Sequence, residues 1–184
     1  MREQLNLFVF TGWPGDGKTT LSRKLALDGL IRISTDELRK ELYPQDYDNI
    51  PYPEGWFTIW EEVCERRDYT LVDSKNVIID SCAHTQYIRD KFLDLGCIEE
   101  FLKEERDAIV RKYLIQLVIT SEERMLRFQK DDTVDGGNFS MRRMSMEFQP
   151  LIYYKREGVS LLQLSNNDEE EQEKCYDLLR SLIS

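Results

Sequence analysis

Short apolar runs alternate with amphipathic segments along the chain. Five runs are nearly continuous and predict buried strands over residues 5–11, 31–34, 76–80, 113–119 and 160–164. Between them, apolar residues recur every three or four positions, which indicates helices. We expect these helices over residues 18–28, 35–43, 56–75, 85–95 and 168–183, with one more from 121 and a helix-permissive stretch at 97–111. Strands that alternate with helices predict a parallel sheet with crossover connections.

The first apolar run leads into a glycine-spaced loop with the sequence GWPGDGKTT. Gly12, Gly17, Lys18 and Thr19 fill the pattern G-x-x-x-x-G-K-[ST], with a predicted strand before it and a helix after it. Glycines let successive N–H groups turn toward phosphate oxygens, and the start of a helix adds its positive end. We expect Lys18 to reach the β- and γ-phosphates of ATP, and Thr19 to bind the Mg²⁺ that bridges them. The candidate nucleotide site comprises Gly12, Gly15, Asp16, Gly17, Lys18, Thr19 and Thr20.

Asp16 is an unusual residue for such a loop. Its carboxylate repels bound phosphates unless the side chain points to solvent, so we expect it to weaken nucleotide affinity. The structural alternative for the whole loop is an ordinary strand-to-helix turn with an exposed lysine. The motif together with its context disfavours that alternative.

A second pair of charged residues follows the second predicted strand. Asp36 comes soon after the strand, and Arg39 lies three positions later on the same helix face. An acceptor would sit at the carboxyl edge of the sheet, where Asp36 can take the proton of an attacking hydroxyl as general base. Arg39 can hold a phosphate or carboxylate of that acceptor. The structural alternative is a helix-capping Asp36 beside a surface Arg39.

Asp80 and a group of basic residues complete the candidate chemistry. Asp80 ends the third strand as a magnesium-side carboxylate would, with capping of the next helix as its alternative role. Arg127 lies with Arg124 and Lys130 at a helix end, just before a polar stretch that contains glycines. We expect Arg127 to cover the transferred phosphoryl group and residues 124–140 to form a lid. A solvated basic face is the alternative.

Three conspicuous side chains are assigned to structure rather than to catalysis. His84 is the single histidine and has no acid-rich stretch near it in the sequence, which favours a polar loop role. Trp56 and Trp60 lie one helical turn apart. Such a pair packs in a core more often than it forms a stacking platform, so we expect core residues.

Charge and composition limit the possible partners. The net charge of −10 argues against broad, non-specific adhesion to nucleic acid, although a short bound end is compatible with it. The first ten residues have too few apolar positions for a signal peptide or a membrane span. The four cysteines have neither metal-site nor disulfide-scaffold spacing. We therefore expect free thiols, a cytoplasmic location and no membrane partner.

Together these motifs resemble the P-loop kinases related to the kinase domain of polynucleotide 5′-hydroxyl kinases, a group with many AAA-type predicted kinases. The resemblance covers most of residues 5–165. Asp36-x-x-Arg39 looks like the family's general base and the arginine that contacts the phosphate next to the acceptor hydroxyl. Arg127 stands where the resemblance implies a lid arginine.

Two further stretches are similar to the same family. Asp80 with Arg89 nine positions later resembles an aspartate and downstream arginine, with Ser81-Cys82 in place of the family's Asn-Thr. Residues 146–150, MEFQP, and 157–159, EGV, resemble its Phe-x-x-Pro and Glu-Gly-Phe stretches. Zeta-toxin-like relatives and kinases of antibiotics or metabolites share the scaffold, so the fold alone leaves the acceptor open.

The sequence thus predicts a single α/β domain over residues 1–184, a three-layer P-loop NTPase sandwich with a five-stranded parallel sheet and a small helical lid. The predicted activity is transfer of the γ-phosphate of ATP, with Mg²⁺, to a hydroxyl acceptor, first of all a 5′-OH polynucleotide or oligonucleotide end. Two alternatives stay open. One is a kinase of a nucleoside, sugar or antibiotic, and the other is a nucleotide-dependent binding module without transfer. The oligomeric state is not predicted.

Overall fold

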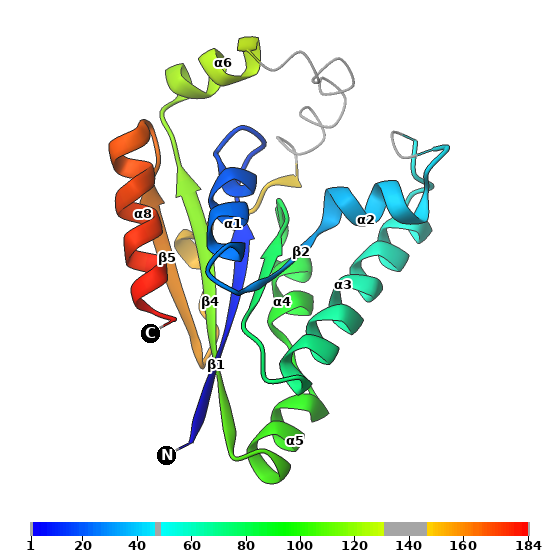
Figure 1. The fold of residues 1–184 in the computed structure, drawn as a ribbon. Helices are drawn as coiled ribbons and strands as arrows, with labels where there is room; N and C mark the ends of the chain where they lie inside the picture. The colour runs from blue at the N-terminus through cyan, green and yellow to red at the C-terminus, as the bar shows by residue number, and fades with distance from the viewer. Residues whose placement is uncertain (1, 47–48, 131–146, 184) are drawn as a thin grey trace.

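The computed structural model describes residues 2–46, 49–130 and 147–183. All five predicted strands are present in it, and they form one parallel sheet in the order β2-β3-β1-β4-β5 (Figure 1). The strands are β1 (Glu3–Thr11), β2 (Ile31–Ser34), β3 (Val77–Asp80), β4 (Ala108–Val118) and β5 (Val159–Ser165). The predicted fold class is therefore confirmed.

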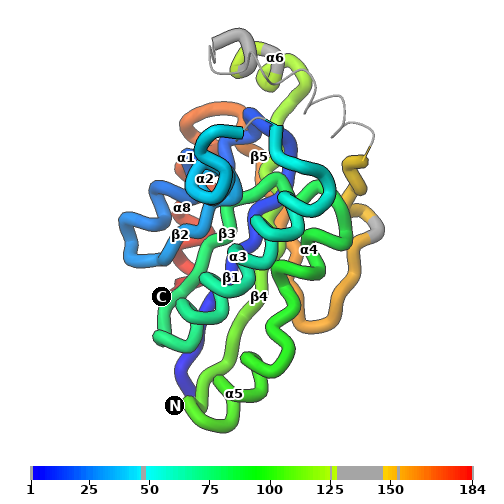
Figure 2. The backbone as a smooth tube through the Cα atoms, turned by 90° about the vertical axis from the view of Figure 1, so that its right-hand side faces the viewer, coloured from blue at the N-terminus to red at the C-terminus, as the bar shows by residue number. Residues whose placement is uncertain are grey.

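The crossover segments are helical, as the apolar spacing predicts. The helices are α1 (Lys18–Ala26), α2 (Thr35–Leu42), α3 (Glu54–Val72), α4 (Gln86–Leu93), α5 (Cys97–Glu105), α6 (Ser121–Lys130) and α8 (Glu169–Ser181), with a 3-10 turn η2 (Leu151–Tyr153). Figure 2 shows α3 and α4 on the face of the sheet that is turned toward the viewer. None of the helices in the described part of the chain combines the length and the apolar character that a membrane span requires.

Alternating side chains of the strands fill two separate cores. Leu7 and Val9 of β1 point to the core under α3 and α4, whereas Phe8 and Phe10 point to the core under α1 and α8. All four side chains are fully buried. Burial of each contributes about 1.5–3 kcal/mol. A central strand covered on both faces explains why its sequence is a continuous apolar run instead of an alternating one.

β4 begins five residues earlier than the apolar pattern predicts, at Ala108 instead of Tyr113. Ala108 and Val110 face the core, whereas Ile109 and Arg111 are exposed. Because charged residues interrupt the apolar run in this half-buried part of the strand, a continuous apolar pattern does not predict it. Pairing with β1 from Glu3 onward extends the strand.

The carboxyl ends of β1, β2 and β3 gather the candidate residues at one edge of the sheet. The chain passes from β1 through α1 to β2 on one side, and from β3 to β4 on the other side of β1. The end of β1 is thus a topological switch point, the usual place for a ligand site in such sheets. The loop of residues 12–17 leaves β1 at this point (Figure 1).

Candidate nucleotide and acceptor site

The glycine-spaced loop is anchored at its beginning to the end of β3. The Gly12 amide donates to the Cys82 carbonyl over 3.0 Å. The buried Thr11 hydroxyl donates to the Cys82 and Ala83 carbonyls over 3.0 and 2.9 Å. These bonds join β1 and β3 just beyond their paired residues, so the loop starts from a rigid base.

The other end of the loop depends on Gly17, which has a φ of +91° immediately before α1. A Cβ atom there would lie 2.3 Å from Asn166 Nδ2. The fully buried Asn166 follows β5 and donates through Nδ2 to the Asp16 carbonyl over 2.6 Å. Asn166, which is 150 residues away in the sequence, therefore fixes the backbone of the loop at Asp16 and requires glycine at position 17. Asn166 is not among the site residues predicted from the sequence, where its one signal is a polar residue directly after a strand at the same sheet edge.

Lys18 lies inside the loop. It is buried, and its Nζ donates to the Gly12 carbonyl over 3.1 Å and to the Trp13 carbonyl over 2.5 Å. Its ammonium group is therefore held against the first two residues of the loop by their backbone oxygens. Thr19 is half-buried and Thr20 is exposed in the same first helical turn. The roles of these residues toward phosphate and Mg²⁺ remain predictions.

Asp16 does not point to solvent. Its side chain is 1% exposed, and it accepts from the Trp13 amide over 2.8 Å and from Arg124 Nε over 3.1 Å. Burial raises the pKa of this carboxyl group, while Lys18 and Arg124 oppose the rise. The loop thus carries an internal carboxylate that is bonded to its own backbone and paired with α6. The repulsion between the Asp16 carboxylate and a bound phosphate is therefore reduced by the ion pair with Arg124, and not by exposure to solvent.

Asp36 lies in the first turn of α2 (Thr35–Leu42) and Arg39 lies in its last turn, three residues further on. The Ser34 hydroxyl caps this helix by accepting from the Glu37 amide, so Asp36 is not its cap. Arg39 NH1 donates to Asp36 Oδ1 over 3.1 Å, and the Asp36 side chain is 73% exposed. The guanidinium carbon of Arg39 also lies 5.2 Å from the ring centre of Trp56. An accessible carboxylate is thus positioned by an arginine that is itself fixed on a ring.

Asp80 is buried beside α1 and is paired with Arg32, which is not among the site residues predicted from the sequence. Its Oδ2 accepts from Ser22 Oγ over 2.9 Å and from Arg32 NH2 over 2.6 Å. Within residues 2–46, 49–130 and 147–183, no group of three or more His, Cys, Asp or Glu side chains is placed to hold a metal. The Arg32 charge opposes direct binding of a second cation at Asp80.

The half-buried Cys82 lies near charged residues of both the nucleotide loop and the acceptor pair. Burial raises the pKa of its thiol, Lys18 lowers it, and Asp36, Asp80 and Asp16 raise it further. Lys18 and Asp16 of the nucleotide loop and Asp36 of the acceptor pair therefore lie within electrostatic range of the chain just beyond β3. The residues that the sequence predicts as donor and acceptor groups are brought together in three dimensions.

Arg127 connects the loop to the end of β5. It donates to the Gly15 carbonyl over 3.2 Å, to the Asn166 carbonyl over 2.6 Å and to the Asn167 carbonyl over 3.0 Å, and it pairs with Glu123. In this conformation its donors are directed at backbone oxygens beside the loop. Its predicted role over the γ-phosphate remains a prediction. Most of the predicted lid, from residue 131 to 140, lies outside the described residues.

The segment after the predicted lid packs against the loop. Phe148 stacks on Trp13 with ring centres 5.1 Å apart, and Glu147 Oε2 lies 3.3 Å from His84 Nε2. His84 thus has a carboxylate partner 63 residues away, which a local sequence search cannot reveal. The buried Arg89 donates to the Ala83 and His84 carbonyls over 2.7 and 3.0 Å, and burial lowers its pKa to about 10. Arg89 therefore stabilises the loop after β3.

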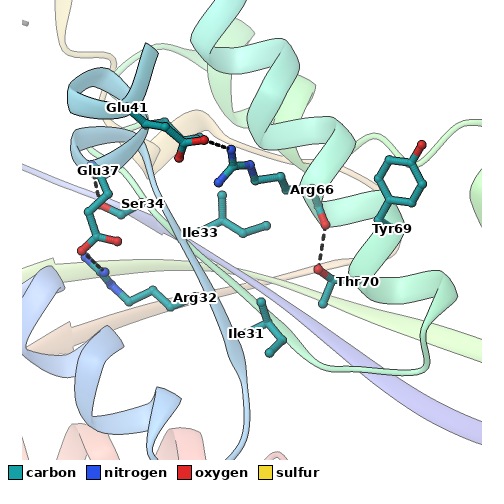
Figure 3. A pocket seen from close by; sticks show the side chains of 10 residues that line it. Ile31, Arg32, Ile33, Ser34, Glu37, Glu41, Arg66, Tyr69 and Thr70 are labelled. Atoms are coloured by element: carbon teal, nitrogen blue, oxygen red, sulfur yellow. Dashed lines mark hydrogen bonds and ion pairs between the residues drawn. The ribbon is translucent and has the colours of Figure 1, made fainter. Parts of the chain in front are cut away.

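A cavity of about 360 Å³ lies elsewhere, at the outer edge of β2 (Figure 3). Ion pairs line its walls, including Arg32 with Glu37 and Arg66 with Glu41. None of the predicted donor or acceptor residues lines it. Its charged groups satisfy one another, so we assign it no part in the reaction.

Comparisons with known proteins identify a family and a fold for this chain. The AAA domain family, AAA_33, matches residues 7–104, which is more than half of the 184-residue chain, so the chain belongs to this family. The match includes the glycine-spaced loop, the Asp36–Arg39 pair and Asp80. A comparison with curated proteins gave no significant match.

Solved structures are similar to the chain over nearly its whole length. A putative kinase from Chloroflexus aurantiacus is 19% identical, with 100% of this chain and 97% of that chain covered and a TM-score of 0.66. A sugar kinase from Janibacter sp. is 19% identical, with 96% and 95% covered and a TM-score of 0.63. Kti12 from Chaetomium thermophilum, solved in complex with ADP-AlF3, is 17% identical, with 97% and 99% covered and a TM-score of 0.60. These similarities establish a P-loop kinase-like fold.

Proposed function

We propose that this protein is an ATP-dependent kinase that transfers the γ-phosphate to a hydroxyl acceptor. The observation that carries the proposal is the Asp36–Arg39 pair, with an exposed carboxylate, at the same sheet edge as the Lys18 loop. A phosphate loop alone fits any nucleotide-binding protein. An accessible base next to it is what transfer to a hydroxyl requires.

The donor half of the reaction uses the loop. Backbone N–H groups of Gly15, Gly17 and the first turn of α1 bind the triphosphate of ATP, and Lys18 neutralises the β- and γ-phosphates. Mg²⁺, when bound, would neutralise further phosphate charge. Thr19 through its hydroxyl and Asp80, which is already paired with Arg32, are the residues that would hold this ion. Binding of related P-loop proteins to nucleotides, as in the Kti12 complex with ADP-AlF3, supports ATP as the donor.

The acceptor half uses α2. The Asp36 carboxylate accepts the hydroxyl proton as the acceptor oxygen attacks the γ-phosphorus atom, and the bond from that atom to the bridging oxygen breaks to release ADP. Arg39 positions Asp36 and offers a cation to an anionic group of the acceptor. Arg127 is the proposed lid arginine. It would have to leave the Asn166 and Asn167 carbonyls to reach the transferred phosphoryl group.

The acceptor that the resemblance favours is the 5′-hydroxyl end of a polynucleotide or oligonucleotide. A small-molecule acceptor is the second candidate, because the chain has a net charge of −10 and its fold is similar to that of a sugar kinase. A short bound end agrees with the acidic charge better than an extended duplex does.

The test is transfer of labelled phosphate from ATP to 5′-OH DNA and RNA oligomers, nucleosides and sugars. We expect Asp36→Asn to lose about 10²-fold in turnover while ATP affinity is kept. Asp73→Asn is the matched control, because Asp73 is similarly exposed and pairs with Lys75 as Asp36 does with Arg39. If the wild type binds ATP and phosphorylates none of the acceptors, a nucleotide-dependent binding module replaces the kinase.

A further inference from the structure

Four aromatic side chains from α3 and α4 form a continuous cluster next to the Asp36–Arg39 pair. Trp60 lies at its centre, with its ring centre 6.3 Å from Trp56, 5.4 Å from Phe57 and 6.1 Å from Tyr87. Phe57 and Tyr87 also meet edge to face, with 6.2 Å between their ring centres. We call these four residues the aromatic cluster.

The aromatic cluster is buried on one side and open on the other. Trp60 is only 9% exposed, as expected for a core residue, and Trp56 is half-buried against the core. Phe57 and Tyr87, in contrast, are 38% and 56% exposed. The core explains the buried rings, but it does not explain two neighbouring aromatic rings that remain in contact with solvent. Exposed aromatic rings that contact each other are a candidate binding surface.

Arg39 connects the aromatic cluster to the proposed chemistry. Its guanidinium lies over the Trp56 ring at 5.2 Å and donates to Asp36 at 3.1 Å. The Arg39 side chain therefore lies between the proposed general base, Asp36, and the ring of Trp56. A molecule whose hydroxyl group lies at Asp36 would place its adjoining part on this surface.

We propose that Trp56, Phe57 and Tyr87 form a subsite that binds the nucleobase of the acceptor. This inference rests on the proposed kinase function and names the substrate class of the same site. A planar base of any identity stacks on aromatic side chains, because every base has a π-face. A nucleoside carries its 5′-hydroxyl one sugar away from its base, which matches a general base and a ring surface separated by Arg39. Stacking also gives an acidic protein a way to bind a nucleoside or a terminal nucleotide without a basic groove.

The experiment measures acceptor binding by calorimetry in the presence of AMP-PNP. The acceptors are adenosine, a 5′-OH trinucleotide and ribitol, a polyol that has no ring. Phe57→Ala and Tyr87→Ala are compared with Phe101→Ala, because Phe101 is 40% exposed on α5, at the far end of the sheet (Figure 1). Tyr87→Phe keeps the ring and removes only the hydroxyl group.

We expect Phe57→Ala and Tyr87→Ala to weaken adenosine and trinucleotide binding by about 5- to 100-fold. Phe101→Ala and Tyr87→Phe should bind as the wild type does, and AMP-PNP affinity should be the same in all variants. Retained AMP-PNP affinity and an unchanged melting temperature show that a variant is folded. Tighter binding of the trinucleotide than of adenosine would identify a polynucleotide end as the source of the base.

Two results separate failure of the subsite from failure of the kinase proposal. If the wild type phosphorylates ribitol as efficiently as adenosine and the alanine variants change neither, the subsite is refuted and the kinase stands. Loss of binding in Tyr87→Phe equal to that in Tyr87→Ala also refutes ring stacking. If AMP-PNP binds but no acceptor is bound or phosphorylated, the kinase proposal itself fails.

Discussion

Arg124→Ala will destabilise the fold by more than the loss of an ordinary surface ion pair. Exposed pairs contribute about 0–1 kcal/mol. The Asp16 carboxylate is 1% exposed, however, and Arg124, at 23% exposure, contacts it at 3.1 Å. Removal of the arginine leaves a buried charge in the loop without its ion-pair partner. Such a charge cannot regain the hydration that it loses on folding.

The size of the effect follows from the geometry of the pair. Two unit charges roughly 4 Å apart interact by about 4 kcal/mol at an effective dielectric constant of 20. Part of this is recovered because Lys18 still interacts with Asp16, and because Arg124 is partly hydrated in the native protein. We therefore expect a loss of about 1–3 kcal/mol in the free energy of unfolding at pH 7. Asp16→Asn keeps an acceptor for the Trp13 amide and should cost less.

Urea unfolding of the wild type, both single variants and the double variant measures this coupling. Because burial raises the pKa of Asp16 in the folded state, protonation stabilises the fold at low pH, and this contribution is lost as the pH rises through that pKa. Arg124→Ala raises the pKa further. Its cost should therefore be largest at neutral pH and shrink as the pH falls through the Asp16 pKa. A cost below about 0.5 kcal/mol at pH 7, or additive single variants, would refute the reasoning.

Three further substitutions test the loop and its support. Lys18→Ala should remove most phosphate transfer while the protein stays folded, as measured by labelled-phosphate transfer and by its melting temperature. Gly17→Ala should lower the free energy of unfolding by about 1–3 kcal/mol in urea titration, because of the φ of +91° and the contact with Asn166. Arg32→Met should cost about 3 kcal/mol in the same assay, because it leaves Asp80 charged and buried.

Two of these substitutions, Gly17→Ala and Arg32→Met, have a matched control in the same chain. Gly29→Ala shares a positive φ of +95° but meets no atom within 4 Å, so it isolates the backbone part of the Gly17 effect. Equal costs at the two glycines would contradict the contact with Asn166. Arg66→Met removes a half-exposed arginine from its two acidic partners and should cost less than 1 kcal/mol. Wild-type transfer by Lys18→Ala would remove Lys18 from the mechanism.

The strands and most helices could be predicted because each depends on local periodicity. A strand covered on both faces, such as β1, must be apolar throughout. A helix that packs on one face of the sheet, such as α1, must have an apolar residue at every third or fourth position. The prediction of β4 began five residues late because its first part is half-exposed and carries charges. Ser34, and not Asp36, is the N-cap of α2. Because the Asp36 carboxylate is not used to cap the helix, it remains accessible.

The nucleotide loop can be predicted from the sequence because all of its groups lie within nine consecutive residues. Spacing alone is enough there, since the loop binds phosphate with its own backbone. The contacts of Asp16 with Arg124 and of Asp80 with Arg32 span 108 and 48 residues. Asn166 reaches the loop across 150 residues. Only the order of the parallel strands brings these partners to one edge, because local sequence carries no information about which strands become neighbours.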